Sequence, residues 1–151
     1  MRHQVSGLKL NRDTNHRKQL VKTMVSQLVL QGSMVTTEAK AKLIRNVTQK
    51  LLVKAKENTL HIRRQLIAQL GNPQAVKQMM DHIAPKLADA PGGFVTMVRQ
   101  GTRRGDNTMM IKLELPVVKE LIQEQAQKAK EEKKIAKKPV KKTDKAESKK
   151  K

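Results

Sequence analysis

The sequence contains no cysteine, tryptophan or tyrosine, and Phe94 is its single aromatic residue. The absence of cysteine excludes a disulfide framework, a thiolate zinc site, an iron–sulfur cluster and a cysteine nucleophile. Acidic residues are also few, because 13 Asp and Glu stand against 33 Lys and Arg, giving a formal net charge of +20. A chain of 151 residues has room for one domain and a tail. Its charge opposes compaction and indicates an anionic partner.

Long apolar runs are missing as well. No stretch approaches the roughly 18 consecutive apolar residues that a membrane-spanning helix needs. The basic N-terminal residues are not followed by the apolar segment of a secretory signal. A membrane-surface role for the basic tail is disfavoured, since the tail lacks large apolar residues facing its lysines. We therefore expect no membrane partner.

Arginine and lysine are distributed unevenly. All nine arginines precede residue 105, and every basic residue after residue 116 is a lysine. The net charge is +13 over residues 1–116 and +7 over residues 117–151. Arginine suits fixed, bidentate contacts, whereas lysine acts as a mobile point charge. We expect a body over 1–116 that carries the fixed recognition, and a lysine-rich tail over 117–151 that changes from helical to disordered.

Apolar spacing and end signals predict about four helices in the body. The end signals are Asp13 or Thr14 and Gly32 for the first helix, Thr36 or Thr37 for the start of the second, Asn58 or Thr59 and Gly71 for the third, and Asn72-Pro73 and Pro85 for the fourth. The buried stripe expected for the second helix is Leu43, Val47, Leu51 and Ala55.

Short β-prone segments lie between and after these helices. Residues 33–36 and 94–99 favour strands, and apolar residues alternate cleanly over 108–115, as in a half-buried strand. The last two strands flank residues 100–107 and predict a hairpin with an exposed loop. We expect helices covering one face of a small mixed sheet, which is an α+β fold.

Catalytic patterns are absent. The carboxylates of the body are scattered, the four histidines lack metal-ligand spacing, and neither glycine-rich phosphate loop pattern occurs. Asp81-His82 is the nearest thing to a catalytic pair, and its ordinary interpretation is a surface histidine. We expect no enzyme, no metal, no cofactor and no small-molecule substrate. A nucleic-acid enzyme using Asp106 or His82 is the alternative in that class.

Basic residues gather in three groups, each of which could also be an ordinary solvated surface. The first is an N-terminal arm leading into a helix, the second is the glycine-flanked pair in the hairpin loop, and the third is a pair on the third helix. Arg45 and Arg99 are further candidates. The candidate RNA-binding residues are Arg2, His3, Lys9, Arg12, His16, Arg17, Lys18, Lys22, Arg45, Arg63, Arg64, Arg99, Arg103 and Arg104.

The scarcity of aromatic residues bears on the kind of nucleic acid. Single-strand binders without sequence preference stack bases on aromatic side chains, and Phe94 alone cannot supply that platform. Recognition must rest on phosphates, sugar hydroxyls and shape, which suits folded RNA or a duplex. Such binding weakens steeply with salt.

Several short motifs occur together in a characteristic order. They are Met1-Arg-His, Gly7-x-Lys-Leu10, His16-Arg17, Thr36-Thr37 before Ala39-Lys-Ala41, Arg63-Arg64, Ile83-Ala-Pro85, Gly92-Gly-Phe94 and Gly105-Asp106. In this combination the sequence resembles the bacterial large-subunit ribosomal protein L17 family through about residue 116.

The resemblance implies a fold, a partner and a set of contacts. The implied fold is an α+β body with a three-stranded sheet. The implied setting is a cytoplasmic ribosome, with large-subunit ribosomal RNA and neighbouring large-subunit proteins near the polypeptide exit side as partners and no catalysis. The family's basic motifs fall on Arg2, His3, His16, Arg17, Arg63, Arg64, Arg103, Gly105 and Asp106.

The expected function is therefore that of a structural constituent of the large ribosomal subunit, which binds and stabilises folded ribosomal RNA. A nucleoid-type protein that compacts DNA is the main alternative, because a high net charge and a lysine-rich tail fit it equally well.

Overall fold

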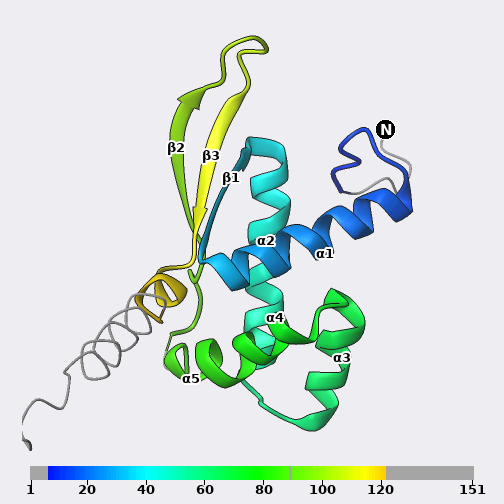
Figure 1. Cartoon of the computed structure of the whole chain (residues 1–151), viewed down its shortest axis with the longest axis vertical. Coiled ribbons are helices and arrows are strands. Elements are labelled where there is room, and N and C mark those ends of the chain that lie inside the picture. The colour runs from blue at the N-terminus through cyan, green and yellow to red at the C-terminus, as the bar shows by residue number, and fades with distance from the viewer. Residues whose placement is uncertain (1–6, 89, 122–151) are drawn as a thin grey trace, which may run out of the picture. The chain divides into compact units, whose positions relative to one another are not determined.

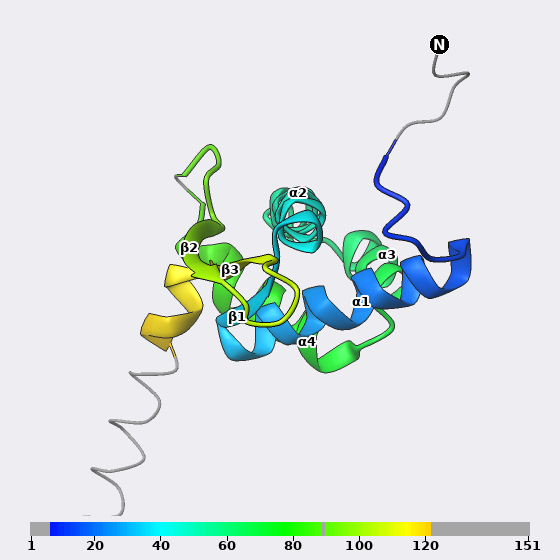
Figure 2. The same ribbon diagram turned by 90° about the horizontal axis from the view of Figure 1, so that it is seen from above.

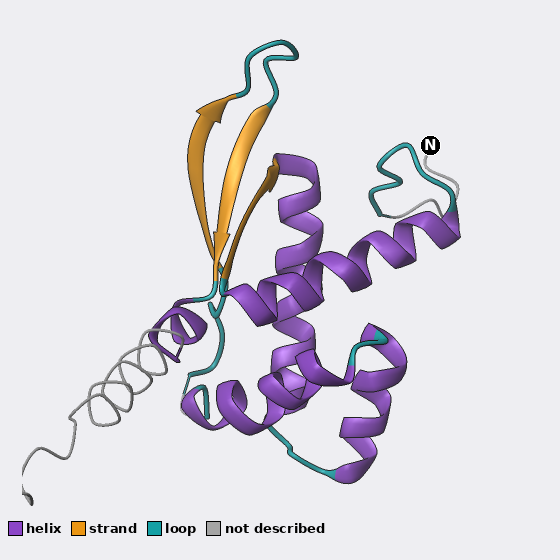
Figure 3. Ribbon diagram, in the orientation of Figure 1, coloured by secondary structure: helices purple, strands orange, loops and turns teal. Residues whose placement is uncertain are grey.

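The computed structural model describes residues 7–88 and 90–121 (Figure 1). Its elements, coloured by type in Figure 3, are α1 (Thr14–Gln31), β1 (Ser33–Thr37), α2 (Glu38–Ala55), α3 (Leu60–Leu70), α4 (Pro73–Lys77), the π-helical turn η1 (Gln78–Ile83), α5 (Ala84–Lys86), β2 (Thr96–Thr102) and β3 (Met109–Glu114). A further helical segment begins at Pro116. Arg2, His3 and the tail from residue 122 onward lie outside the described residues.

Two helices end at glycines, as the sequence predicts. Gly32 follows α1 with φ +73°, and its N–H donates to the carbonyl of Leu28 at 2.9 Å. Gly71 follows α3 with φ +69°, and its N–H donates to the carbonyl of Ile67 at 2.8 Å. A left-handed residue without a Cβ satisfies the last carbonyls of a helix at little steric cost, so both predictions of a helix end are confirmed.

Side-chain caps begin two of the other helices. The hydroxyl of Thr59 accepts from the N–H of Ile62 at 3.3 Å at the start of α3. The Asn72 side chain accepts from the N–H of Gln74 at 3.0 Å, with Pro73 in the first turn of α4. Both starts agree with the sequence, because a cap and a proline act locally.

The expectation that Pro85 ends the fourth helix is wrong, since helical structure runs from α4 through η1 and α5 to Lys86. Before the proline the helix widens, and the N–H of Ala84 donates to the carbonyl of Met79, five residues back. Proline lacks an N–H and its ring clashes with the carbonyl four residues earlier, so a regular α-turn does not fit there. The widened turn accommodates it.

The sheet has the strand order β1-β3-β2, and both pairings are antiparallel. The expectation of a mixed sheet is therefore wrong. Strands β1 and β2 do run parallel, but β3 lies between them, so no parallel pair forms. Strand β2 begins at Thr96 and extends to Thr102 with an irregularity between Arg99 and Gly101, which makes the hairpin loop shorter than predicted.

One face of the sheet is covered by helices. On that face Ile111 and Leu113 are buried at 2% and 0% exposure, whereas Val35 and Val98 on the opposite face are 49% and 44% exposed. Figure 2 shows α1 and α2 on one side of the strands. The hairpin of β2 and β3 extends past β1 and carries its loop away from the helices (Figure 1).

The buried face of α2 differs in part from the predicted stripe. Leu51 and Ala55 are buried as expected, whereas Leu43 and Val47 are partly exposed. The buried residues are Ala41, Ile44, Thr48, Leu51, Leu52 and Ala55. Helix α2 contacts α1, α3, β1 and β3, so its neighbours decide which face is buried. Small residues such as Ala41 allow those neighbours to approach closely.

Candidate nucleic-acid interface

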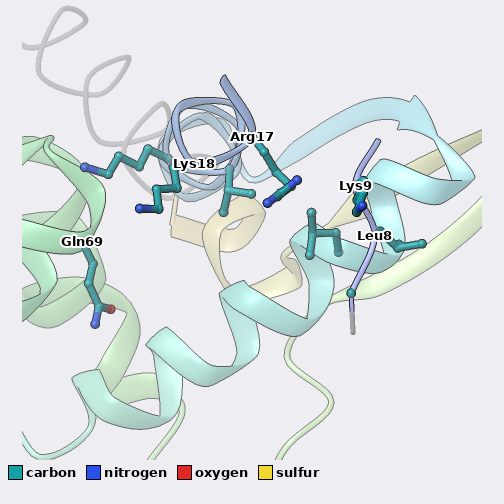
Figure 4. A pocket seen from close by; sticks show the side chains of 9 residues that line it. Leu8, Lys9, Arg17, Lys18 and Gln69 are labelled. Atoms are coloured by element: carbon teal, nitrogen blue, oxygen red, sulfur yellow. The ribbon is translucent and has the colours of Figure 1, made fainter. Parts of the chain in front are cut away.

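A groove of about 400 Å³ lies where the N-terminal arm passes α1, and we name it the α1 groove (Figure 4). Four predicted RNA-binding residues line it: Lys9, Arg17, Lys18 and Lys22. The other lining residues are Gly7, Leu8, Val21, Leu43 and Gln69. No carboxylate is among these lining residues, so the positive charge of the groove is not neutralised from within.

Helical spacing explains the cationic side of the α1 groove. Arg17 and Lys18 lie one turn from Val21 and Lys22, so these side chains share one face of α1. Val21 and Leu43 supply apolar surface between the charges, against which the stems of the basic side chains can lie. The groove is therefore lined by both aliphatic and cationic side chains.

The arm reaches the groove through a tight turn. Leu10 and Asn11 have left-handed backbone conformations with φ +57° and +50°. The N–H of Arg12 donates to the carbonyl of Lys9 at 3.2 Å, and Arg17 Nη1 donates to the carbonyl of Arg12 at 3.3 Å. This turn holds Lys9 beside the basic face of α1.

Two predicted residues of the same segment do not line the groove. His16 Nδ1 lies 3.1 Å from Oδ2 of Asp13, and both side chains are about three-quarters exposed. The backbone of Arg12 anchors Arg17, while its own side chain is exposed to solvent. The α1 groove therefore contains four members of the predicted N-terminal group.

A second basic region follows the side of α2 that faces β2. Arg45 Nη1 lies 3.9 Å from the sulfur of Met97 on β2. Lys42 Nζ bonds Glu38 at 2.8 Å, and this contact, with a smaller attraction from Arg99, holds the pKa of Glu38 below its ordinary value. The structure thus brings Arg45 and Arg99 to one seam between a helix and a strand, apart from the α1 groove.

The hairpin tip, residues 103–108, is held by one carboxylate. Asp106 accepts from Arg103 through both carboxylate oxygens, with Nε to Oδ1 at 3.2 Å, and its Oδ1 also accepts from the N–H of Thr108 at 3.2 Å. These hydrogen bonds, led by that of Arg103, lower the pKa of Asp106 far below its ordinary value. Arg104 is exposed and has no partner among the described residues.

The arginine pair on α3 likewise has one member bound to a carboxylate and one exposed member. Arg63 Nη2 bonds Asp81 of η1 at 2.6 Å, whereas Arg64 is exposed. Asp81 thus pairs with Arg63, and His82 is exposed, as the interpretation of His82 as a surface histidine expects. Within the described part of the chain, no three His, Asp or Glu side chains form a group that could hold a metal ion.

Sequence reasoning did not connect two residues of other helices with the α1 groove. Leu43 comes from α2 and Gln69 from α3, and both line the groove with the basic residues of α1. Nothing in the local sequence connects these positions, because only the packing of three helices brings them together. The spacing of the α1 residues was the one signal available.

The comparison with known protein families settles the assignment. The family model for ribosomal protein L17 matches residues 20–116, a span that runs from α1 to the end of the hairpin. The chain belongs to the ribosomal protein L17 family. The resemblance seen in the sequence is thereby confirmed, and with it the expectation of a non-enzymatic protein, because L17 family members are structural components of ribosomes.

Curated L17 proteins are similar over most of the chain. The large ribosomal subunit protein bL17 of Carboxydothermus hydrogenoformans is 42% identical over 107 residues, which cover 71% of this chain and 96% of the relative. That of Thermomicrobium roseum is 42% identical over 114 residues, covering 76% and 97%. That of Syntrophotalea carbinolica is 35% identical over 136 residues, covering 90% and 86%. Among residues 7–88 and 90–121, no helix of this L17 chain is long and apolar enough to cross a bilayer.

Proposed function

We propose that this L17 chain, which is a structural constituent of the large ribosomal subunit, binds and stabilises folded ribosomal RNA there. The observation that carries the proposal is the α1 groove, which is lined by Lys9, Arg17, Lys18 and Lys22 and by no carboxylate. Four cations around one depression of about 400 Å³ suit a phosphate backbone. Membership of the L17 family supports ribosomal RNA as the partner.

The side chains that line the α1 groove can orient the RNA backbone as well as attract it. The guanidinium of Arg17 offers a planar fork for two phosphate oxygens, while Lys18 and Lys22 act as point charges. The amide of Gln69 can both donate and accept, which suits a ribose 2′-hydroxyl, the group that distinguishes RNA from DNA. The groove therefore reads backbone and sugar and needs no base stacking.

Other basic residues extend this contact. Arg45 and Arg99 at the α2 seam, Arg64 on α3 and Arg104 at the hairpin tip are exposed and positioned for further phosphates. Arg2, His3 and the lysines of the 117–151 tail would add contacts in gaps between RNA helices. Neighbouring large-subunit proteins on the exit side complete the proposed surroundings of the 1–116 body.

Removal of charge from the groove tests the proposal. In the variant Arg17→Gln/Lys18→Gln we expect reduced occupancy in salt-washed large subunits. For isolated ribosomal RNA we expect the slope of log affinity against log salt to become shallower by about 1.4–1.8, as for two lost phosphate contacts. The matched control is Lys50→Gln/Lys54→Gln, which removes two exposed lysines of α2 that do not line the groove. Wild-type occupancy of the groove variant would refute the proposal.

Compaction of DNA is the alternative function, and only the net charge favours it. It predicts equal affinity for random duplex DNA and for ribosomal RNA. A competition filter-binding assay at about 150 mM salt, where nonspecific phosphate binding is already weak, separates the two. Preference for ribosomal RNA supports the ribosomal function, and equal competition by DNA supports the alternative.

A further inference from the structure

The two adjacent arginines of the hairpin tip have different surroundings. The guanidinium of Arg103 is bound through Nε and Nη2 to both carboxylate oxygens of Asp106. The Arg103 N–H also donates to the carbonyl of Thr108 at 2.9 Å, which closes the loop across its base. Arg104, the next residue, makes none of these contacts and is exposed.

Asp106 connects both sides of the loop. Besides Arg103, its Oδ1 accepts from the N–H of Thr108 at 3.2 Å, and its carbonyl accepts from the hydroxyl of Thr108 at 3.5 Å. Its neighbours Gly105 and Asn107 both have left-handed conformations, with φ +103° and +50°. One carboxylate thus joins the start of the loop to its end, over a backbone that bends sharply on either side.

We propose that Asp106 and Arg103 form an internal clamp that fixes the shape of the hairpin tip, and that Arg104 is the tip residue that contacts RNA phosphate. This inference rests on the proposed RNA-binding function and assigns roles within it. Asp106 and Arg103 are positioning residues, because they act on RNA through the loop that they hold. The negative charge of Asp106 is compatible with a nearby phosphate chain because Arg103 neutralises it.

The physical reason for such a clamp is entropic. A loop that is mobile in the free protein must be ordered when it binds, and that cost reduces affinity. A tip already closed by Arg103, Asp106 and Thr108 presents Arg104 without this cost. The loop also lies at the end of a hairpin that extends past β1, and its residues 103–107 are exposed to solvent (Figure 1).

Asp106→Asn gives the sharpest test, because charge and clamp predict opposite signs. The substitution removes a negative charge, so simple attraction predicts tighter binding to RNA. It also breaks the ion pair while keeping an oxygen that can accept from Thr108, so the clamp predicts weaker binding by about two- to tenfold, the cost of ordering one side chain. The matched control is Glu57→Gln, which removes one exposed carboxylate after α2, away from the tip.

The two arginines are separated by the salt dependence of binding. Arg104→Gln should make the slope of log affinity against log salt shallower by about 0.7–0.9, as for one lost phosphate contact. Arg103→Gln should weaken binding with little change of slope. In the variant Arg103→Gln/Asp106→Asn the losses should not add, because each single substitution already opens the same clamp.

The full chain and protein-free large-subunit ribosomal RNA are the materials for these measurements. Thermal unfolding should show that each variant is still folded. The substituted tip residues are exposed, so their replacement removes no contact of the core. Tighter or unchanged binding by Asp106→Asn, or a slope change for Arg103→Gln equal to that for Arg104→Gln, overturns the clamp. If the wild-type chain itself shows no salt-dependent binding to this RNA, the proposed function fails, which is a distinguishable result.

Discussion

Gly32 and Val118 approach each other so closely that a Cβ added to Gly32 would lie 3.0 Å from Cγ1 of Val118. The same Cβ would lie 3.2 Å from the backbone nitrogen of Lys119. The carbonyl of Gly32 also accepts from the N–H of Leu115 at 2.8 Å. The end of α1 is thereby joined to the segment that follows the sheet, and this junction leaves little room for a side chain at position 32.

Gly32→Ala should destabilise the protein for two separable reasons. A left-handed alanine costs about 1–2 kcal/mol, and the contact with Val118 and Lys119 adds to it. The matched control is Gly71→Ala, since Gly71 has a similar φ of +69° and a Cβ added there would meet nothing within 4 Å. Urea unfolding should show a larger loss of unfolding free energy for Gly32→Ala. Equal losses would contradict the packing role of Gly32.

Thr48 is fully buried on α2, and its hydroxyl has no hydrogen-bond partner among the described residues. A buried polar group without a partner costs about 1–3 kcal/mol. Thr48→Val removes the hydroxyl at nearly constant shape and should raise the unfolding free energy by about 1 kcal/mol. Thr23→Val on the exposed side of α1 is the control and should have little effect. A loss of stability for Thr48→Val would show that the hydroxyl is satisfied in solution.

The ends of the helices could be predicted from the sequence because their causes are local. Gly32, Gly71 and Asn72-Pro73 act on the backbone within a few residues, and each marks the boundary that the structure has. The alternation of Ile111 and Leu113 with polar neighbours likewise indicated the covered face of the sheet. These features need no knowledge of distant contacts.

The incorrect predictions have distant causes. Leu43, predicted to be buried, lines the α1 groove instead, and Thr48 lies in the core. Both positions follow from the packing of α2 against several other elements. The strand order that makes the sheet antiparallel depends on where β1 is inserted, which no local pattern encodes. At the candidate site, the pairing of Arg63 with Asp81, which lies 18 residues further along the chain, could not be foreseen, whereas the contact of Asp106 with Arg103 is local and agrees with the expectation of a turn held by Asp106.

The lowered pKa of Glu114 predicts how the free energy of unfolding depends on pH. Its Oε1 lies 2.9 Å from Lys112 Nζ and 2.6 Å from Lys119 Nζ, and these contacts, that of Lys119 first, hold its pKa below the ordinary value of 4.5. Because the folded state binds the proton less readily, this contribution is present above pH 4.5 and is lost as the pH falls through the lowered pKa.

Glu114→Gln should therefore lower stability at neutral pH and flatten the fall in stability below pH 4.5, the ordinary pKa of this side chain. Unfolding free energies measured across this range check the prediction. Glu57→Gln, at an exposed position after α2, serves as the comparison and should leave the acid slope nearly unchanged. An unaltered slope for Glu114→Gln would show that the two lysines do not hold the carboxylate in solution.

Arg63 and Arg64 provide a matched pair for separating stability from RNA binding. Arg63 joins α3 to η1 through Asp81 at 2.6 Å, with both side chains about one-third exposed, whereas Arg64 is exposed. We expect Arg63→Gln to lower the unfolding free energy by about 0.5–1 kcal/mol, as for a partly exposed ion pair, with little change in the salt dependence of RNA binding. Arg64→Gln should leave stability unchanged and make the salt slope shallower by about 0.7–0.9. Urea unfolding and filter binding on the two variants measure both quantities, and a shallower slope for Arg63→Gln would show that Arg63 leaves Asp81 to contact RNA.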